Sequence, residues 1–270
     1  MSYGGKRAVP SGVPRRPLLA SETMNFVDML CPSCALFLDF DGTLVDLAPQ
    51  PDAVLVPSGL VATLDALSQR LGGALALISG RPIEQIDAFM KPLHLPVAGV
   101  HGTERRRADG DLTLLSTHPL QRVEQAAMRL VDRHPQLRIE KKRGSLALHY
   151  RQAPELECAC LRAMQEAVEQ SPGLTLLRGK MVVEAKPGGA SKGHAIEAFM
   201  QEPPFAGRRP VFVGDDFTDE VGFAAVQRLQ GLGVKIGEGA TVAWQRLASP
   251  AALRQQLQTA AAPKAGKASA

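Results

Sequence analysis

The sequence lacks any run of about 20 apolar residues, the length that a membrane-spanning helix needs. It also lacks, near its start, the apolar core of a signal peptide. Residues 1–23 are instead rich in glycine, proline and basic side chains. We therefore expect no membrane partner and a disordered basic tail over residues 1–23. The Ala- and Lys-rich residues 259–270 are expected to form a second disordered tail.

The body of the chain has little net charge. The formal net charge is +4, but residues 1–23 hold a net +3 and residues 259–270 a net +2, which leaves about −1 for the remainder. Nucleic-acid binding requires a basic face on the folded domain. The charge distribution therefore predicts no nucleic-acid partner.

Cysteine is also scarce, with four residues in 270. Cys31 and Cys34 have the C-x-x-C spacing of a redox motif or of half a zinc site. Cys158 and Cys160 are separated by one residue on a predicted helix, which is poor zinc geometry. The pattern favours free thiols over a zinc site.

The stretch L-F-L-D-F-D-G-T-L, at residues 36–44, joins an apolar strand pattern to two carboxylates. Asp39 and Asp41 are two residues apart, so both side chains can reach one pocket at the end of the strand. Ligands bind at that edge of open α/β sheets. Two adjacent carboxylates repel each other, and a divalent cation such as Mg²⁺ relieves the repulsion. The alternative is a strand that simply ends in an acidic turn.

Apolar periodicity predicts an α/β fold with a parallel, Rossmann-like, doubly wound sheet. Short apolar runs alternate with amphipathic helices over residues 24–111 and again over residues 187–258, including two closing helices at residues 241–247 and 251–258. Residues 112–186 instead follow the order helix, hairpin, helix, hairpin, with a weak internal αββ repeat. We expect this α+β segment to form a cap domain inserted into the core.

Three further polar groups stand at predicted strand ends or helix starts. Ser79 ends the second strand, where it suits either a phosphate oxygen or a helix N-cap. Lys192 opens a helix, a position where the helix dipole disfavours a cation, so it is either a surface lysine or a side chain that neutralises Asp39 and a phosphate. Residues 214–219, G-D-D-F-T-D, place three acids after a strand, where they suit a metal site or a helix cap.

In this order, the D-x-D-G-T motif, the serine, the lysine and the G-D-D-x-x-D motif resemble the four motifs of the haloacid dehalogenase-like phosphohydrolases. The resemblance implies that Asp39 is the nucleophile and that Asp41 is the general acid and base. It further implies that Ser79 and Lys192 hold the phosphate.

The same resemblance implies a Mg²⁺ site built from Asp39, the backbone carbonyl of Asp41, and Asp215. Asp219 is expected to act on the metal indirectly, through a water molecule. Asp216 could join either role, and its assignment stays open.

Four segments resemble more narrowly the trehalose-6-phosphate phosphatases: G-V-H-G-x-E at residues 99–104, A-L-H-Y-R-Q-A-P at 147–154, V-V-E-x-K-P at 182–187 and G-D-D-x-T-D-E at 214–220. The likeness covers about residues 34–257. It implies Mg²⁺-dependent hydrolysis of trehalose 6-phosphate to trehalose and phosphate, the last step of trehalose biosynthesis. Some relatives carry a branched residue and Arg where this chain has Ala185 and Lys186, so the charge is kept but the guanidinium fork is lost.

The residues expected to bind substrate lie at the pocket edge or on the cap: Thr43, Gly80, Arg81, His101, Gly102, Glu104, Lys142, His149, Arg151, Glu184 and Lys186. Each has a plainer alternative. His149 could be an exposed strand residue, and Glu184 and Lys186 could form a surface ion pair worth under about 1 kcal/mol.

Other functions remain open at this point. One is another sugar phosphatase on the same scaffold, of the sucrose-phosphate or mannosyl-phosphoglycerate type. Others are an Asp-phosphorylated signalling receiver, which would need neither Asp41 nor a cap, and an inactive regulator of the synthase. We expect a cytoplasmic monomer whose partner is the small-molecule substrate, with transient contact to trehalose-6-phosphate synthase allowed.

Overall fold

A computed structural model describes residues 26–48, 50, 53–114, 119–142 and 144–262. The tail expected at residues 1–23 lies outside the described residues, as do residues 263–270 of the second tail. Among the described helices, none is long and apolar enough to cross a membrane.

The described residues form an eight-stranded sheet in the order β12-β11-β10-β1-β2-β3-β4-β5. Neighbouring strands from β12 to β3 are parallel, whereas β4 and β5 join as antiparallel edge strands. The expected α/β class with a parallel core is therefore confirmed. The strands are β1 (Cys34–Leu38), β2 (Leu75–Ile78), β3 (Val97–Gly99), β4 (Glu104–Arg106), β5 (Leu112–Leu114), β10 (Arg209–Gly214), β11 (Leu232–Ile236) and β12 (Gln245–Leu247).

Strand β1 is central because its sequence, C-A-L-F-L, is apolar on both faces. All five side chains are buried, which requires helices above and below the sheet. Leu38 at the end of β1 pairs with Val213 of β10 and with Leu77 of β2. The three strands therefore end at one level, and the polar residues after them gather at one edge of the sheet.

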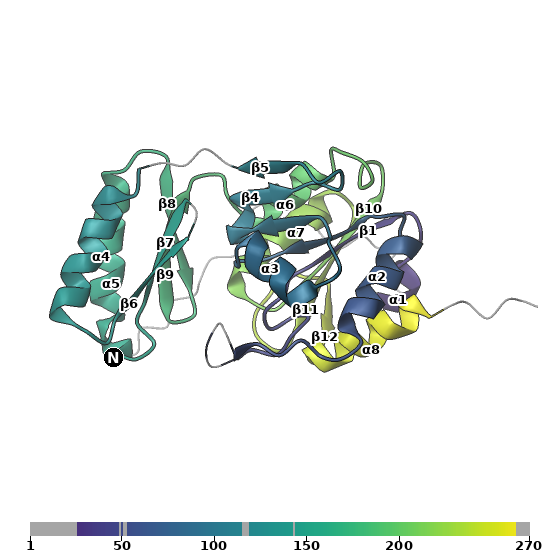
Figure 1. Ribbon diagram of the computed structural model, residues 1–270, viewed down its shortest axis with the longest axis horizontal. Coiled ribbons are helices and arrows are strands. Elements are labelled where there is room, and N and C mark those ends of the chain that lie inside the picture. The colour runs from purple at the N-terminus through teal and green to yellow at the C-terminus, as the bar shows by residue number, and fades with distance from the viewer. Residues whose placement is uncertain (1–25, 49, 51–52, 115–118, 143, 263–270) are drawn as a thin grey trace, which may run out of the picture.

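Helices cover both faces of this sheet. Helix α2 packs against α8, which also contacts α1, and α6 packs against α7, which contacts β10 and β11. In Figure 1, α2, α3 and α8 lie in front of the sheet and α6 and α7 behind it. The core helices are α1 (Phe26–Met29), α2 (Leu60–Arg70), α3 (Ile83–Met90), α6 (Lys192–Phe199), α7 (Glu220–Arg228) and α8 (Pro250–Ala261), with the short 3₁₀ turns η2 (Val100–Gly102) and η4 (Phe217–Asp219).

A second, smaller sheet forms the inserted cap, in the order β6-β7-β9-β8. The weak sequence repeat corresponds to two αββ units, whose second strands β7 and β9 pair at the centre of the sheet. Figure 1 shows this sheet between its own helices and the eight-stranded core. The cap elements are α4 (Gln121–Arg133), β6 (Arg138–Lys142), β7 (Ser145–His149), η3 (Pro154–Leu156), α5 (Glu157–Glu169), β8 (Leu174–Gly179) and β9 (Val182–Pro187).

Alternation along the cap strands separates two faces. Leu146, Leu148, Val183 and Ala185 belong to the apolar cluster that packs under α4 and α5. The residues between them along β7 and β9 point the other way. The cap thus presents a polar face toward the core.

Three expectations about boundaries are wrong. Strand β5, at Leu112–Leu114, pairs with β4 in the core sheet, so the cap does not begin at residue 112. The helix expected at residues 241–247 is instead strand β12, which pairs in parallel with β11. Helix α8 extends to Ala261, into the tail expected from residue 259, because Ala260 continues the buried face of Leu253 and Leu257.

The errors at β5 and β12 have the same physical source. A three-residue strand has too little periodicity to show which sheet it joins, and the hydrogen-bond ladder of a neighbouring strand outweighs local propensity.

Candidate active site

Three carboxylates meet at the carboxyl edge of the core sheet. Asp39 follows β1, Asp215 follows β10, and Asp219 lies in η4. Each offers one oxygen atom, and these atoms all lie within 4.8 Å of one another. Gly42 makes this proximity feasible, because a Cβ there would stand 2.2 Å from Oδ2 of Asp215, and its φ of +76° suits glycine.

The Lys192 ammonium compensates part of this negative charge. Its Nζ donates to Oδ1 of Asp39 and to Oδ1 of Asp219, both at 2.7 Å, and the lysine is buried. Ser191 caps helix α6 by accepting a hydrogen bond from the His194 amide, which sets the first turn that carries Lys192. The sequence left Lys192 either at the surface or in the pocket, and the structure places it in the acid cluster.

Asp219 has both carboxylate oxygens engaged. Besides the bond from Lys192, its Oδ2 accepts hydrogen bonds from the amides of Asp215 and Asp216, at 3.0 and 2.9 Å. This arrangement fits the indirect role expected for Asp219 at a metal. Asp216 caps the turn η4, where its Oδ1 accepts from the Phe217 amide, so the alternative of a helix-capping acid fits this residue best.

The Thr43 hydroxyl lies between two of the acids, 3.2 Å from Oδ2 of Asp39 and 3.2 Å from Oδ1 of Asp215. It can donate its single proton to one of them at a time. Thr43 therefore bridges the two carboxylates. It reaches this place because Gly42, with its positive φ, turns the chain in the loop that follows β1.

The titration of these groups reflects crowding. Burial, together with the charges of Asp219 and Asp215, raises the pKa of Asp39 well above its ordinary value even though Lys192 opposes the shift. Burial and Asp219 raise the pKa of Asp215 to about 6. Burial by itself lowers the pKa of Lys192, but Asp219 and Asp39 outweigh it and raise that pKa. One ammonium among three carboxylates leaves the cluster short of positive charge.

A divalent cation fits this set of donors. Carboxylate oxygens are the ligands that Mg²⁺ prefers, and it binds proteins through one or two carboxylates plus waters and phosphate oxygens. Asp39 and Asp215 offer such oxygens, and a cation between them would reverse the upward pKa shifts. Within the part of the chain that the structure describes, Asp39, Asp215 and Asp219 are the acids that lie close enough together to hold a metal ion.

Asp41 is bound by Arg81. The Arg81 Nε lies 2.6 Å from Oδ2 of Asp41 and an Nη lies 2.8 Å from Oδ1, a two-point ion pair. About 30% of the Asp41 side chain is exposed, so solvent can reach this carboxylate. The position suits a group that exchanges protons with a bound substrate and with water, once Arg81 releases it.

The loop after β2 lies beside the acids. Ser79 is buried, and its Oγ accepts a hydrogen bond from the Arg81 amide at 3.1 Å. Gly80 lies against His101, since a Cβ on Gly80 would stand 2.7 Å from the imidazole. A Cβ on Gly102 would stand 2.9 Å from the Ser191 carbonyl oxygen. Gly80 therefore lets His101 pack against the loop after β2, and Gly102 lets η2 pack against the start of α6.

Glu104 does not face the pocket in the way that was expected. It is buried in β4, and its Oε2 accepts a hydrogen bond from the Ile83 amide, at the first residue of α3. A carboxylate there satisfies a free helix N–H and the positive end of the helix dipole. Glu104 thus serves helix α3.

Cap residues complete the site from the other side. Lys142 of β6 donates to the Gly80 carbonyl at 3.3 Å and lies 3.7 Å from the Glu184 carboxylate. Glu184 of β9 accepts from the Ser145 hydroxyl at 2.6 Å and lies 3.6 Å from Nε2 of His101. These contacts join cap and core directly above the pocket edge.

Glu184 is held as an anion by its surroundings. Burial by itself would raise its pKa, but His101, Lys142 and Ser145 hold the pKa of Glu184 well below its ordinary range. Burial lowers the pKa of His101, partly opposed by Glu184. Nδ1 of His101 is buried and has no hydrogen-bond partner among the residues that the structure describes.

Three other cap residues lie less close to the acids than expected. Lys186 is buried and donates to the Ala190 carbonyl, and burial lowers its pKa to about 8. His149 is hydrogen-bonded to Glu140 at 2.8 Å. Arg151 is exposed and lies beyond the end of β7 opposite to Ser145, and its assignment to substrate binding stays a prediction.

Two residues of the site were missed in the sequence. Glu140 lies on the polar cap face, 3.9 Å from Lys142, and its two-residue spacing from Lys142 on a strand was the available signal. Lys235 is buried at the end of β11 and donates to the backbone carbonyl of Asp215 and to that of Ile236. A charge inside the apolar run V-K-I was its signal.

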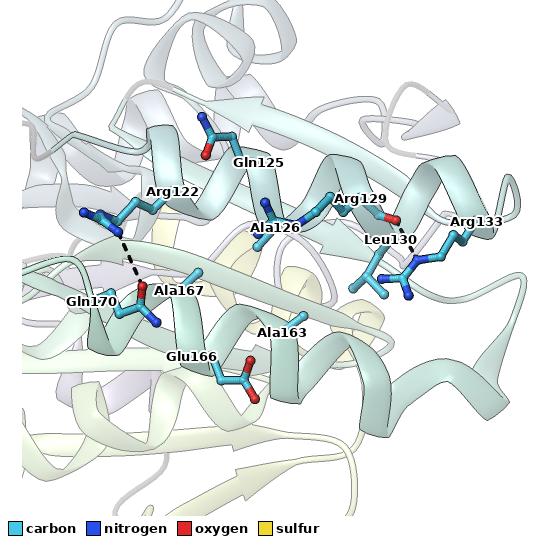
Figure 2. A pocket seen from close by; sticks show the side chains of 10 residues that line it. All are labelled: Arg122, Gln125, Ala126, Arg129, Leu130, Arg133, Ala163, Glu166, Ala167 and Gln170. Carbon is cyan, nitrogen blue, oxygen red and sulfur yellow. Dashed lines mark hydrogen bonds between the residues drawn. The ribbon is translucent and has the colours of Figure 1, made fainter.

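A shallow groove of about 350 Å³ occurs elsewhere, between α4 and α5 (Figure 2). Arg122 and Arg129 line it from α4, and Glu166 and Gln170 line it from α5. Arg122 contacts Gln170 across the groove at 3.4 Å. The groove lies on the helical side of the cap, and Glu166, the one carboxylate among its lining residues, is not part of the group of acids that could hold a metal ion. We therefore assign the chemistry to the acid cluster.

A parallel sheet that carries this acid cluster at its carboxyl edge, beneath an inserted α+β cap, defines a phosphohydrolase with the haloacid dehalogenase-like fold. The family model for trehalose-phosphatases matches residues 37–254, and the chain belongs to that family.

Individual relatives agree with this placement. The chain is 46% identical over 230 residues to trehalose-6-phosphate phosphatase of Escherichia coli, and the aligned residues cover 84% of this chain and 86% of that protein. It is 45% identical over 205 residues to a probable trehalose-phosphate phosphatase of Sinorhizobium fredii, covering 75% and 77%. The C-terminal domain of the Candida albicans enzyme superposes with a TM-score of 0.78 at 21% identity, covering 87% and 94%, and this likeness supports the fold.

Proposed function

We propose that this protein hydrolyses trehalose 6-phosphate to trehalose and phosphate, with Mg²⁺ and through a phosphorylated Asp39. The observation that carries the proposal is that the acid cluster of the core and the polar face of the cap lie against each other. A buried Asp39 with Lys192 at 2.7 Å lies beneath a polar cap face whose Lys142 touches the core loop at Gly80. The relatives' names supply the identity of the sugar.

The first step is attack on phosphorus. An oxygen of the Asp39 carboxylate forms a bond to phosphorus while the bond to the sugar O6 breaks. Lys192, and the hydroxyl and amides of the Ser79 loop, stabilise the equatorial phosphate oxygens. Asp39 and Asp215, with the Asp41 backbone, would hold Mg²⁺, which supplies positive charge to the phosphate and to the crowded acids.

Proton transfer falls to Asp41. It protonates the departing O6 of the sugar, and afterwards it takes a proton from the water that attacks the phosphorylated Asp39. Phosphate then leaves and Asp39 is restored. Because Arg81 occupies both oxygens of Asp41 in this structure, Asp41 must turn from Arg81 toward the substrate before it can act.

Sugar recognition falls to the cap face. Trehalose offers hydroxyl groups that both donate and accept hydrogen bonds. Glu140 and Glu184 accept, Lys142 donates, and Nδ1 of His101 has no hydrogen-bond partner within the described part of the chain. A face of this composition closes over a neutral disaccharide and excludes water from the phosphate.

The proposal is tested by phosphate release with Mg²⁺ from trehalose 6-phosphate, sucrose 6-phosphate, glucose 6-phosphate and p-nitrophenyl phosphate. We expect kcat/KM to favour trehalose 6-phosphate by about 100-fold or more, the scale that a few specific contacts provide. Equal rates over the panel would leave the reaction chemistry in place and overturn the assignment of the sugar.

The nucleophile is tested by Asp39→Asn. The amide preserves shape but cannot attack phosphorus, so we expect kcat to fall by at least about 10³-fold. Thermal unfolding and Mg²⁺ binding should remain largely intact as controls. Retained turnover would remove Asp39 from the reaction.

The monomeric state, the cytoplasmic location and a transient contact with the synthase stay predictions from the family resemblance. Sedimentation of the purified chain, alone and with the synthase, is the direct measurement of the first and the third.

A further inference from the structure

A pair of cysteines at the amino end of β1 takes no part in the phosphatase reaction. Cys34 is the first residue of β1 and is buried, whereas Cys31 is partly exposed. Their Sγ atoms lie 3.3 Å apart. Asp39 comes five residues later, roughly 17 Å away at the rise of an extended strand. The pair is therefore remote from the acid cluster.

The loop that carries the two sulfurs is fixed by the core. Arg208 donates one Nη to the carbonyl of Pro32 at 2.6 Å, to that of Cys34 at 3.3 Å and to that of Leu71 at 2.6 Å. The neighbouring Arg209 amide donates to the Ser33 carbonyl at 3.0 Å. These bonds hold the C-P-S-C backbone against the end of α2 and the start of β10, so the fold itself brings the two sulfurs close together.

The two thiols differ in the way that thiol–disulfide exchange requires. A hydrogen bond with Ser33, at 3.0 Å, lowers the pKa of the accessible Cys31 thiol. Burial raises the pKa of Cys34 to about 11, and that thiol donates to the Met29 carbonyl. The thiolate is the attacking species. Cys31 therefore reacts first with an incoming disulfide, and Cys34 reacts in the second step.

We propose that Cys31 and Cys34 form a dithiol site that reacts with small-molecule disulfides and closes to an intramolecular disulfide. The Cys31 thiolate attacks one sulfur of the incoming disulfide, which forms a mixed disulfide and releases one thiolate. Cys34 then loses its proton to solvent and attacks Sγ of Cys31, which releases the second thiolate. The dithiol is oxidised by two electrons and the incoming disulfide is reduced to two thiols. Closure is fast because the second sulfur is already adjacent.

The test uses the folded full chain and oxidised glutathione as the probe. After incubation and trapping of free thiols with an alkylating reagent, peptide mass spectrometry should find the Cys31–Cys34 peptide lighter by two hydrogens and unalkylated. Cys158 and Cys160 provide the internal control. Both lie on helix α5 rather than in a C-x-x-C loop, and Cys158 is exposed whereas Cys160 is buried. They should stay alkylatable under the same conditions.

Two variants separate the roles. In Cys34→Ser, glutathione should remain on Cys31, and in Cys31→Ser neither the mixed nor the closed disulfide should form. Activity on p-nitrophenyl phosphate should be unchanged in both, which reports that each variant is folded. A stable mixed disulfide on Cys31 of the unaltered chain, or reaction at Cys158 at least as fast as at Cys31, would overturn the proposal.

Discussion

Single residues of the active site act mainly by balancing charge. Three acids gather at the ends of β1 and β10, and one buried lysine is bonded to two of them. Burying this excess of negative charge costs free energy unless a cation joins the site. The same excess of negative charge therefore gives the cluster its affinity for Mg²⁺, whose positive charge also favours binding of a phosphate.

Lys235 offers a test of how a metal ligand is positioned. Its buried ammonium donates to the backbone carbonyl of Asp215, so it orients that residue without touching the phosphate. In Lys235→Met the carbonyl loses its donor, and we expect the Mg²⁺ concentration for half-maximal activity to rise about 10-fold or more. The KM for trehalose 6-phosphate at saturating Mg²⁺ should change little.

Lys180→Met is the matched control, because Lys180 is exposed in the turn between β8 and β9. It should leave the Mg²⁺ requirement unchanged. An Lys235→Met enzyme that loses kcat or KM but keeps the original Mg²⁺ requirement would show that Lys235 supports the fold rather than Asp215.

At the scale of elements, the alternation of side chains along the cap strands gives the cap sheet one apolar face and one polar face. One face of β7 and β9 packs under α4 and α5, and the other carries Ser145 and Glu184 toward the core. A one-residue shift in register would exchange these faces. The polar face is therefore specified by the same pattern that builds the apolar interior of the cap.

Glu184→Gln tests this face. The charge that His101 and Lys142 surround is removed while the shape is kept. We expect kcat/KM for trehalose 6-phosphate to fall by about 100-fold, whereas p-nitrophenyl phosphate, which lacks the sugar, should lose only a few-fold. Glu166→Gln, in the groove between α4 and α5, should affect neither substrate. Equal losses on both substrates would remove Glu184 from sugar recognition.

At the scale of the whole molecule, metal binding should be linked to pH and stability. The pKa of Asp215 is raised from 3.8 to about 6, so the folded, metal-free protein favours the protonated carboxyl group. The resulting contribution to the free energy of unfolding is fully present below pH 3.8 and is lost as the pH rises through about 6. Mg²⁺ requires the ionised carboxylate, and at about 100 times its Kd it should add about 2.7 kcal/mol to the free energy of unfolding. The gain in Tm on adding Mg²⁺ should therefore be small at pH 5 and full at pH 7.5.

Asp215→Asn is the control for this linkage. It should abolish most of the gain in Tm at both pH values. A gain that is the same at pH 5 and pH 7.5 in the unaltered chain would contradict a site in which the pKa of Asp215 is about 6.

The sequence by itself determined the class of the fold and the chemical centre. Short apolar runs that alternate with amphipathic helices indicate central parallel strands. Asp39, Ser79 and Asp215 are then expected at one edge of the sheet, because parallel strands end together. The αββ repeat of the cap was likewise visible, since helix and hairpin periodicities differ.

Only the tertiary structure decided which polar groups serve the site and which serve the scaffold. Glu104 and Asp216 cap helical turns, Arg151 lies beyond the far end of β7, and Lys235 reaches Asp215 from a neighbouring strand. The identity of these residues says nothing of their partners, because those partners are brought near by strand pairing and cap closure rather than by spacing along the chain. For the same reason, the C-x-x-C spacing suggested a dithiol, but only the folded loop set the two sulfurs 3.3 Å apart.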